Sequence, residues 1–345
     1  MKHSLSIFCL LFFCVYNAQS QHQPFDKILN PSRVIFYNVE NLFDTIANPG
    51  TDDAEYLPTS KNEWNTKKYQ IKLKHTAKTL AALLDTIQPL VIGLCEIEDA
   101  QVLEDLIAQP ALKKFNFGVV HRDSPDERGI DCAILYNKDA FNESFSAFMP
   151  VNFPFDPGDK TREIVYLKGY INEGEPLWFF VNHWPSRLGG KEKSDAKRAY
   201  VAQVLKDKIE NIYLGEKYAH VIVMGDFNDN PNDSTLSILS VVKKNSRAEQ
   251  MINLMKPLAE RNEFSLRYRE ENDIFDQFIV SQNLLDQKNP YYMRLDGAHI
   301  FNPSFLLYND PKYGLVPSRT FARGRWVGGY SDHLPVYFDV VFTSP

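Results

Sequence analysis

Short apolar runs recur along the chain and are separated by polar segments containing glycine, proline, asparagine or aspartate. Each run has the length of a strand and is bounded by such turn-forming residues, which favours a strand over a buried helix. The runs predict strands at residues 33–38, 90–95, 130–137, 176–182, 220–225, 274–280 and 335–341.

Other segments place apolar residues three or four positions apart, which is the spacing of one face of a helix. This spacing predicts a helix over residues 66–86, with Tyr69, Leu73, Ala77, Leu80 and Leu84 facing inward. Residues 100–109 predict a shorter helix, and residues 192–212 predict a longer one with a charged outer face. Because strands and helices alternate, the sequence indicates a layered α/β domain.

The N-terminus has the pattern of a secretory signal peptide over residues 1–20. A basic start precedes an apolar run at 5–16, and Ala18-Gln19-Ser20 offers small residues at the usual cleavage spacing. The run is too short to span a bilayer, although a retained N-terminal anchor stays open as an alternative. We therefore expect a secreted or periplasmic protein with one mature domain over residues 21–345 and no transmembrane segment.

One segment departs from the alternation of strands and helices. Residues 44–65 are rich in proline, glycine, aspartate, asparagine and threonine, and predict a long loop. Loops of this length inside a compact domain are usually functional or poorly ordered.

Composition narrows the classes of function. The chain is 44% hydrophobic and 24% charged, as in soluble globular proteins, and its formal net charge is −6. An acidic balance argues against a protein that coats nucleic acid through bulk charge, but it allows an enzyme with a locally basic cleft. Cys95 and Cys132 lie in apolar runs, where buried free thiols are the favoured interpretation and a disulfide stays open. Nothing in the sequence implies a stable protein partner.

Polar residues recur beside the predicted strands. They are Asn38, Glu96, Asn182-His183, Asp226 with Asn228, and Ser331-Asp332-His333. Sites in layered α/β proteins commonly lie at strand ends. One polar residue at a strand end means little, but this repetition predicts that several strands contribute to one site.

The carboxylates and amides of this set suit a hard cation such as Mg²⁺, with Mn²⁺ or Ca²⁺ as alternatives. Mg²⁺ takes few protein ligands, and Glu96, Asn38 and Asp332 would supply them. The absence of a C-x-x-C pair argues against a zinc–thiolate site.

The remaining residues suit attack of water on a phosphorus atom. Asp226 could deprotonate the water, and Asn228, two residues further on, could orient the water or the phosphate. His183 and His333, if protonated, could stabilise charge on the phosphate oxygens, each with a carboxylate behind it.

Several of these residues stand in longer motifs. The motifs are VIFYNVENLFDT at 34–45, VIGLCEIED at 91–99, FFVNHWPSR at 179–187, VIVMGDFNDNP at 221–231, FDQFIVS at 275–281 and YSDHLPV at 330–336. Together they resemble the endonuclease/exonuclease/phosphatase superfamily, which includes pancreatic-type deoxyribonucleases, apurinic endonucleases, inositol polyphosphate phosphatases and bacterial sphingomyelinases. The resemblance covers roughly residues 33–341 and, with the signal-like start, suggests a secreted bacterial-type member.

The resemblance implies a four-layer α/β sandwich, with two mixed sheets packed face to face and helices outside. It makes Glu96 the principal metal carboxylate, places Asn38 and Asp332 beside the metal, and gives Glu40 as a second acidic ligand. The implied cofactor is Mg²⁺.

The resemblance also implies roles on the side of the phosphate. Asp226 matches the residue that activates or orients the water, and Asn228 matches a phosphate contact. His333 would pair with Asp276. His183 matches the second histidine of the deoxyribonuclease and phosphatase branches, and Asp131 is the expected carboxylate behind it.

Two basic stretches flank the motif residues. Arg187 follows His183, and three arginines precede Asp332, namely Arg319, Arg323 and Arg325. Arginine grips phosphate oxygens with two parallel hydrogen bonds, so these four arginines are expected to contact phosphate.

These observations lead to a hydrolase of phosphoester bonds. The first hypothesis is an exported endonuclease that cleaves DNA or RNA. The alternative is a phosphatase or phosphodiesterase acting on phospholipid head groups, inositol phosphates or sugar phosphates. A non-catalytic binding protein on the same scaffold is disfavoured by the complete motif set. The loop at 182–184 differs from that of apurinic endonucleases and argues against repair of abasic sites.

Overall fold

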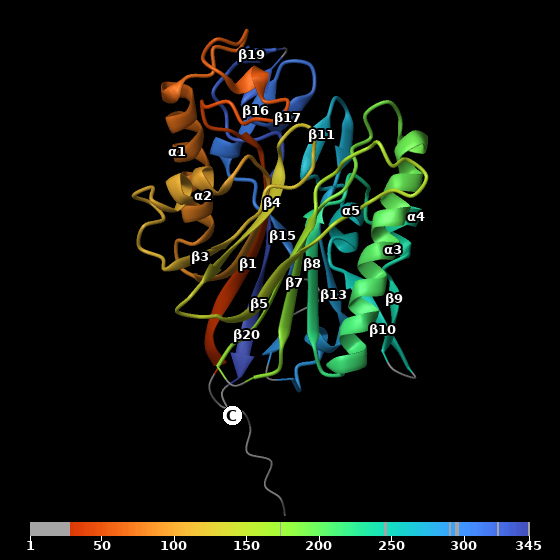
Figure 1. Ribbon diagram of the computed structural model, residues 1–345. Helices are drawn as coiled ribbons and strands as arrows, with labels where there is room; N and C mark the ends of the chain where they lie inside the picture. Colours follow the sequence, from red (N-terminus) through yellow and green to blue (C-terminus); the bar gives the residue numbers. More distant parts are fainter. Residues whose placement is uncertain are drawn as a thin grey trace, which may run out of the picture.

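The computed structural model describes residues 28–172, 174–244, 247–289, 291–293, 297–322 and 324–343. The predicted signal peptide over residues 1–20 and the predicted phosphate contact Arg323 lie outside these ranges. Two large sheets face each other, with α1 and α2 beside one and α3 beside the other (Figure 1).

The first sheet has the strand order β14-β20-β1-β2-β4-β3, with β15 also paired to β20. Only its central pair, β1 and β2, is parallel. Its strands are β1 (Ile28–Leu42), β2 (Gln88–Ile97), β3 (Phe117–Val120), β4 (Asp131–Asn137), β14 (Tyr291–Tyr292), β15 (His299–Ile300) and β20 (Val336–Thr343).

The second sheet has the order β5-β6-β7-β8-β13-β10-β9, and its parallel pair is β7 and β8. Its strands are β5 (Asn142–Met149), β6 (Ile164–Tyr170), β7 (Leu177–His183), β8 (His220–Asp226), β9 (Val241–Lys244), β10 (Arg247–Asn253) and β13 (Asp276–Ser281). Both sheets are therefore mixed, as the resemblance implied.

The helices are α1 (Thr66–Leu83), α2 (Ala100–Ile107), α3 (Lys191–Gly215), α4 (Ser234–Ser237) and α5 (Lys256–Glu260), with 3-10 turns η1 (Ala54–Tyr56), η2 (Gln282–Leu285) and η3 (Ser304–Leu306). The side chains of Asn65 and Asp99 accept hydrogen bonds from Lys68 N and Val102 N, and so cap the starts of α1 and α2. None of the helices in the described ranges is long and apolar enough to cross a membrane.

Small hairpins lie at the upper end of the sandwich in Figure 1. They are formed by β11 (Leu266–Tyr268) with β12 (Glu271–Asp273), β16 (Leu307–Asp310) with β17 (Gly314–Pro317), and β18 (Phe321–Ala322) with β19 (Arg325–Trp326). Between β1 and α1 the chain forms only the turn η1, in the segment predicted to be a long loop.

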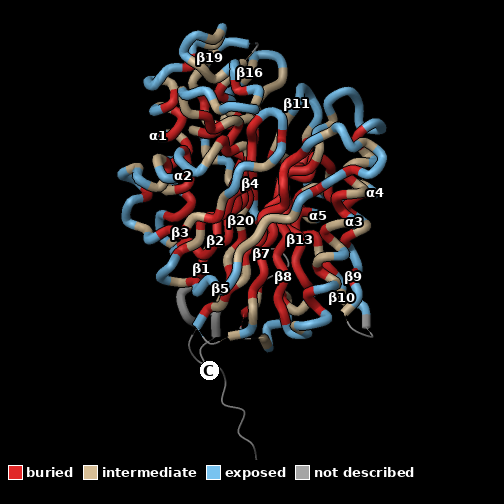
Figure 2. The backbone as a smooth tube through the Cα atoms, in the orientation of Figure 1, coloured by how far each residue is buried: buried red, intermediate tan, exposed pale blue. Residues whose placement is uncertain are grey.

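Three apolar clusters fill the spaces between four layers, and buried residues form the centre of the molecule (Figure 2). Phe36, Met224 and Phe278 belong to the cluster between the two sheets. Leu73 of α1 packs with the outer face of the first sheet, and Leu205 of α3 with that of the second. The prediction of a four-layer α/β sandwich is confirmed.

The predicted elements are present, with shifted ends. The first helix ends at Leu83, three residues before its predicted end, and β1 extends beyond its predicted bounds at both ends. The sequence did not predict β5, whose residues are exposed or half-buried because it is an edge strand. Its weak alternation of polar and apolar positions therefore gave no strand signal.

Candidate active site

The polar residues beside the strands meet at one edge of the sandwich, at the upper end in Figure 1. In the first sheet, Asn38 of β1 lies opposite Cys95 of β2. In the second sheet, Asp226 of β8 lies opposite His183 on one side and Asp276 on the other. Parallel neighbours end at the same edge of a sheet, so these pairings bring chemistry from both sheets together.

Glu96 occupies an irregular position at the end of β2. The pairing of β2 with β4 shifts between Cys95 and Ile97, and Glu96 has a φ of +63°. Positive φ is uncommon outside glycine and clusters at functional sites. Its Oε2 accepts a 2.9 Å hydrogen bond from Asn41 N, whereas Oε1 accepts only a 3.4 Å bond from Asn38 Nδ2. Oε1 therefore keeps lone pairs for a further ligand.

Asp226 lies at the centre of the site and is only 2% exposed. Its Oδ2 accepts a 3.0 Å bond from Asn38 Nδ2, and its Oδ1 accepts one of 3.0 Å from Asn228 N. The Nε2 atoms of His183 and His333 each lie 3.7 Å from Oδ2. Burial raises the pKa of Asp226 to about 6, while the charge of His333 opposes this rise. Asp226 is thus mostly ionised at neutral pH and more basic than an exposed aspartate.

His333 is held by Asp276, as the resemblance implied. Its Nδ1 lies 2.7 Å from Asp276 Oδ2, which also accepts a 2.6 Å bond from Ser265 Oγ. Burial alone would lower the pKa of His333, but the carboxylates of Asp276 and Asp226 raise it well above the usual value. His333 is therefore a cation whose Nε2 points toward Asp226.

His183 is in a different state. Burial lowers its pKa well below the usual value, and the charges of Arg162 and Arg128 act in the same direction. Its Nε2 lies 4.0 Å from Glu96 Oε1, and its buried Nδ1 has no hydrogen-bond partner among the described residues. The two histidines are therefore not equivalent, since only His333 carries a charge at neutral pH.

Asp131 does not support His183, so this expectation is wrong. Asp131 Oδ1 accepts a 3.0 Å bond from Ser124 N, and its Oδ2 lies 3.6 Å from His121 Nε2. The reason is local, because the two oxygens of Asp131 face Ser124 N and His121 Nε2 of the preceding loop.

Asn228 has a φ of +50°, and its Nδ2 donates to the Trp184 carbonyl at 3.0 Å. Arg187 Nε donates to the Asn228 carbonyl at 2.7 Å, and its Nη2 contacts Asp229 at 3.0 Å and Asp233 at 2.7 Å. Arg187 therefore braces the loop that carries Asn228, and its contact with phosphate stays a prediction.

Glu40 and Asp332 face Arg319. Arg319 Nη2 donates to Asp332 Oδ2 at 2.7 Å, and its Nε lies 3.7 Å from Glu40 Oε1. Glu40 is buried and accepts a 2.6 Å bond from Thr320 N, and burial raises its pKa to about 7. Arg319 is thus paired with Asp332, and its contact with phosphate stays a prediction. Arg325 lies in β19, and within the described ranges no side-chain hydrogen bond or ion pair joins it to the site.

The donor set fits a divalent cation. Oxygen atoms of Glu96, Asn38 and Asp332 are the kind of ligand that Mg²⁺, Mn²⁺ and Ca²⁺ prefer. Glu96 Oε1 is under-used by the protein, and the side chain of Glu96 is 13% exposed, so an ion can reach it. Asp226, Asp276 and His333 also place ligand atoms within 4.8 Å of one another, but Asp276 and His333 are already bonded to each other.

The sequence missed residues that orient the site. Ser331 Oγ donates to the Asn38 carbonyl at 2.8 Å and accepts from His333 N at 3.0 Å, so it joins the two sides. Ser265 supports Asp276. Arg162 is buried and pairs with Asp126 at 2.9 Å. Its Nη2 donates a 3.2 Å hydrogen bond to the carbonyl of Trp184, the residue after His183. Ser331 could have been found inside the Ser-Asp-His motif, whereas Arg162 precedes a strand that the sequence did not reveal.

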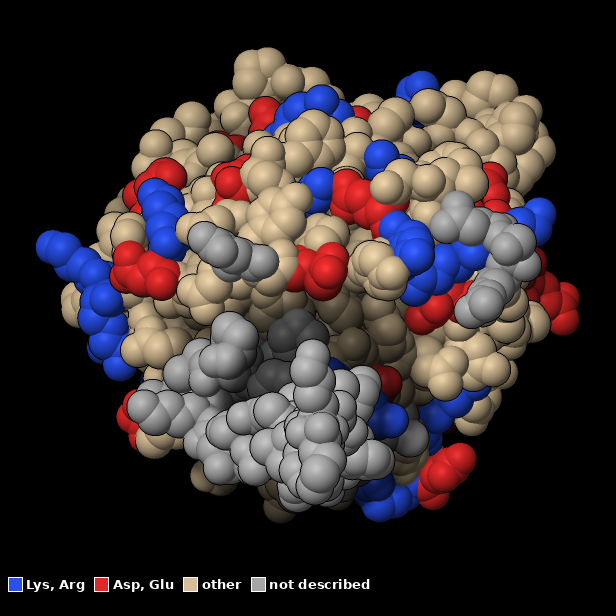
Figure 3. All heavy atoms as spheres, turned by 90° about the horizontal axis from the view of Figure 1, so that it is seen from below, with Lys and Arg blue, Asp and Glu red and all other residues tan. Residues whose placement is uncertain are grey.

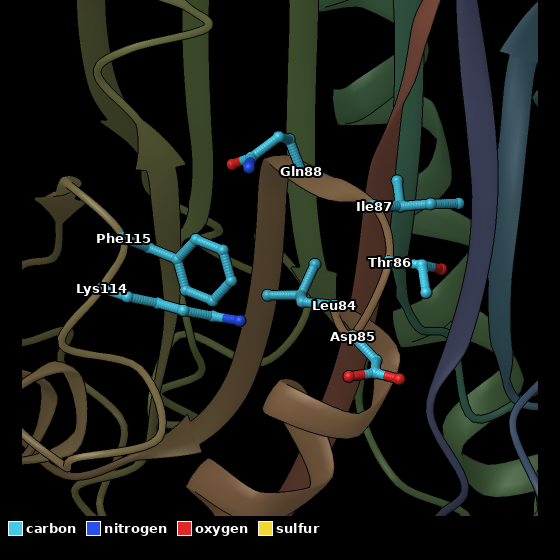
Figure 4. Close-up of a pocket in the computed structure, with 7 residues that line it drawn as sticks. All are labelled: Leu84, Asp85, Thr86, Ile87, Gln88, Lys114 and Phe115. Atoms are coloured by element: carbon cyan, nitrogen blue, oxygen red, sulfur yellow. The ribbon is translucent and has the colours of Figure 1, made fainter.

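A hollow at the other end of the sandwich has a different lining. This hollow of about 200 Å³ lies where α1 leads into β2, and Asp85 and Lys114 are its only charged lining residues (Figure 4). It offers one carboxylate and no histidine, and it lies at the opposite end of β2 from Glu96. Seen from below, positive and negative side chains are interspersed on this end (Figure 3).

Comparisons with solved structures show the fold. The chain resembles a humanized D. rerio TDP2 with 15% identity and a TM-score of 0.54, covering 90% of this chain and 98% of that one. It resembles a Bacteroides thetaiotaomicron mannosyl-6-phosphatase with 16% identity and a TM-score of 0.54, covering 90% and 100%. The human Nocturnin catalytic domain, determined with bound sulfate, gives 17% identity, a TM-score of 0.52, and coverage of 92% and 97%.

A search of curated protein sequences finds no match. The model of one protein family, described as the Endonuclease/Exonuclease/phosphatase family, matches residues 33–341. This span contains every residue of the strand-edge site. The chain therefore belongs to the endonuclease/exonuclease/phosphatase family and is a hydrolase of phosphoester bonds.

Proposed function

We propose that the protein is an exported, Mg²⁺-dependent nuclease that hydrolyses phosphodiester bonds of DNA or RNA. The observation that carries the catalytic part is the buried carboxylate of Asp226. Its Oδ2 lies 3.7 Å from the Nε2 atoms of two histidines, of which His333 is charged and His183 is neutral. Such perturbed, convergent groups are typical of catalytic sites. Export rests on the signal-like residues 1–20.

In this proposal Asp226 accepts the proton of the attacking water. The water oxygen forms a bond to phosphorus as the bond to the leaving oxygen breaks, and the leaving oxygen takes a proton from solvent water. His333, kept charged by Asp276, donates a hydrogen bond to a phosphate oxygen, and neutral His183 and Asn228 position the phosphoryl group.

A divalent cation held by Glu96, Asn38 and Asp332 would offset the negative charge that develops on phosphate oxygens in the transition state. The side chain of Asp332 is 26% exposed and that of Glu96 is 13% exposed, so an ion can reach both carboxylates. The ion contact of Asp332 would compete with Arg319, which lies 2.7 Å from it. Metal binding is therefore expected to loosen this arginine.

Nucleic acid is the preferred substrate because a protein of the same fold, D. rerio TDP2, is known in complex with a single-strand DNA product. One observation favours a second candidate, a phosphatase of small substrates. Arg187 and Arg319 are neutralised by carboxylates, so they do not supply the free positive charge expected along a polyanion. The mannosyl-6-phosphatase of the same fold fits this alternative.

The test is hydrolysis by the mature protein, residues 21–345, with Mg²⁺ or with EDTA. The substrates are plasmid DNA, RNA, sphingomyelin, inositol phosphates and a hexose 6-phosphate. We expect metal-dependent cleavage of DNA or RNA. Cleavage of the hexose phosphate alone would replace the nuclease by the phosphatase, and no hydrolysis of any substrate would refute both. Export is tested separately by N-terminal sequencing of the protein recovered outside the cytoplasm.

A further inference from the structure

The arginines next to the site differ in whether their charge is already paired. Arg162, Arg187 and Arg319 each contact a carboxylate at 3.0 Å or less. Arg128 is exposed, and within the described ranges it forms no ion pair. Its side-chain bond is a 2.8 Å contact from Nη2 to Asn41 Oδ1, which leaves most of its donors available.

Arg128 is nevertheless joined to the site. Asn41, which accepts from its guanidinium, donates its own backbone N–H to Glu96 Oε2 at 2.9 Å. The charge of Arg128 also lowers the pKa of His183. The exposed guanidinium is thus linked to the Glu96 carboxylate through a single residue, Asn41.

The loop that carries Arg128 is anchored rather than loose. Asp126 accepts a 3.1 Å bond from Arg128 N and pairs at 2.9 Å with the buried Arg162. Gly129 has a φ of +66°, and a side chain there would meet Thr51, so the turn needs glycine. An anchored loop holds an exposed arginine in place before a ligand arrives, which reduces the entropy lost on binding.

Tyr56 lies in η1, in the loop between β1 and α1. Asp52 N donates to the Glu127 carbonyl at 2.7 Å, which ties the loop after β1 to the loop of Arg128. The ring of Tyr56 stacks on Phe43 at 4.1 Å and is half-buried. Burial and the charge of Glu96 raise the pKa of Tyr56, so its hydroxyl keeps its proton and can donate it. The charge of Arg128 acts on the pKa of Tyr56 in the opposite direction.

We propose that Arg128, assisted by the Tyr56 hydroxyl, binds the non-bridging oxygens of the substrate phosphoryl group. The sequence assigned contacts with phosphate to Arg187, Arg319, Arg323 and Arg325. The proposal rests on the proposed function of the site as a phosphoesterase. Arg128, which would select for phosphate, lies outside the sequence motifs that carry the family resemblance. The proposal also gives a role to the long loop at 44–65, which supplies Tyr56.

The experiment measures binding of inorganic phosphate by titration calorimetry in Mg²⁺ buffer, and kcat/KM on bis(4-nitrophenyl) phosphate and 4-nitrophenyl phosphate. We expect Arg128→Gln to weaken phosphate binding about tenfold or more and to lower kcat/KM to a similar extent. Arg128→Lys keeps the positive charge but lacks the planar guanidinium. Its phosphate affinity and kcat/KM should lie between those of Arg128→Gln and the unsubstituted protein. Tyr56→Phe removes only the hydroxyl and should weaken phosphate binding about fivefold.

Arg261→Gln is the matched control, because Arg261 is also exposed but is paired with Glu263 away from the site. It should leave binding and rate unchanged. Phosphate binding by Arg128→Gln within threefold of the unsubstituted protein would overturn the proposal, whatever the enzyme hydrolyses. The two proposals can fail separately. If the unsubstituted protein hydrolyses no substrate but Arg128→Gln loses phosphate binding, the proposed function is refuted and the contact between Arg128 and phosphate stands.

Discussion

Replacing Asp276 by asparagine isolates the carboxylate that keeps His333 charged. Asp276 is fully buried, and its Oδ2 lies 2.7 Å from His333 Nδ1. Asparagine has the same shape, so Asp276→Asn removes the negative charge and leaves the packing of β13 in place. The change therefore tests electrostatics rather than folding.

The distances set the size of the effect. At an effective dielectric constant of about 20, a unit charge pair at 2.7 Å attracts by roughly 6 kcal/mol and a pair at 3.7 Å by roughly 4 kcal/mol. Asp276 thus supplies the larger of the two attractions on His333, and Asp226 the smaller. Because burial disfavours the imidazolium, loss of the larger attraction should leave His333 mostly neutral at pH 7.

We expect Asp276→Asn to lower kcat/KM on plasmid DNA or bis(4-nitrophenyl) phosphate by roughly 10²-fold or more. Thermal unfolding should change little, since His333 can release its proton and no buried charge is stranded. Asp339→Asn is the control, because it removes a carboxylate paired with Arg33 at 2.7 Å outside the site. A rate for Asp276→Asn within threefold of the unsubstituted protein, with the same unfolding temperature, would refute the assignment of His333 as the charged donor.

Other expectations follow from single positions. Glu96→Gln should weaken Mg²⁺ binding about tenfold or more by calorimetry, and unchanged affinity would remove Glu96 from the metal site. His220 is buried, and burial lowers its pKa to about 4. As the pH falls from 6.5 to 4, the unfolded chain binds a proton at this position before the folded chain does, so His220 should lower the free energy of unfolding. In denaturant titrations, the free energy of unfolding of His220→Gln should fall by roughly 3 kcal/mol less over this pH range than that of the unsubstituted protein. Gly225→Ala would place a Cβ 2.4 Å from the Asn182 carbonyl, and should lower the free energy of unfolding by roughly 1–3 kcal/mol.

Much of the fold could be predicted because strands and helices are local patterns. The runs that became β2, β7 and β8 are buried on both faces, so they appear as continuous apolar stretches. The edge strand β5 is exposed or half-buried along its whole length, and it was missed. Low burial explains the failure at β5, but not at β6, which was also missed although most of its residues are buried.

The donor set could also be predicted, because it depends on which residues stand where strands end. Asn38, Glu96, Asp226 and His333 are brought together as expected, and Asp276 bonds His333. These contacts follow from strand order and from pairing register, which place motif residues of both sheets at one edge.

The sequence by itself determined the layered fold and the identity of the groups at its edge. Only the tertiary structure decided the charge state and pairing of those groups. Arg187 and Arg319 looked like free cations along the chain, yet carboxylates from other segments neutralise them, while Arg128 stays unpaired. Asp131 looked like the partner of His183, yet its two oxygens face groups of the preceding loop. The reason is physical: strand formation depends on near neighbours in sequence, whereas an ion pair depends on a few ångströms between residues far apart in it.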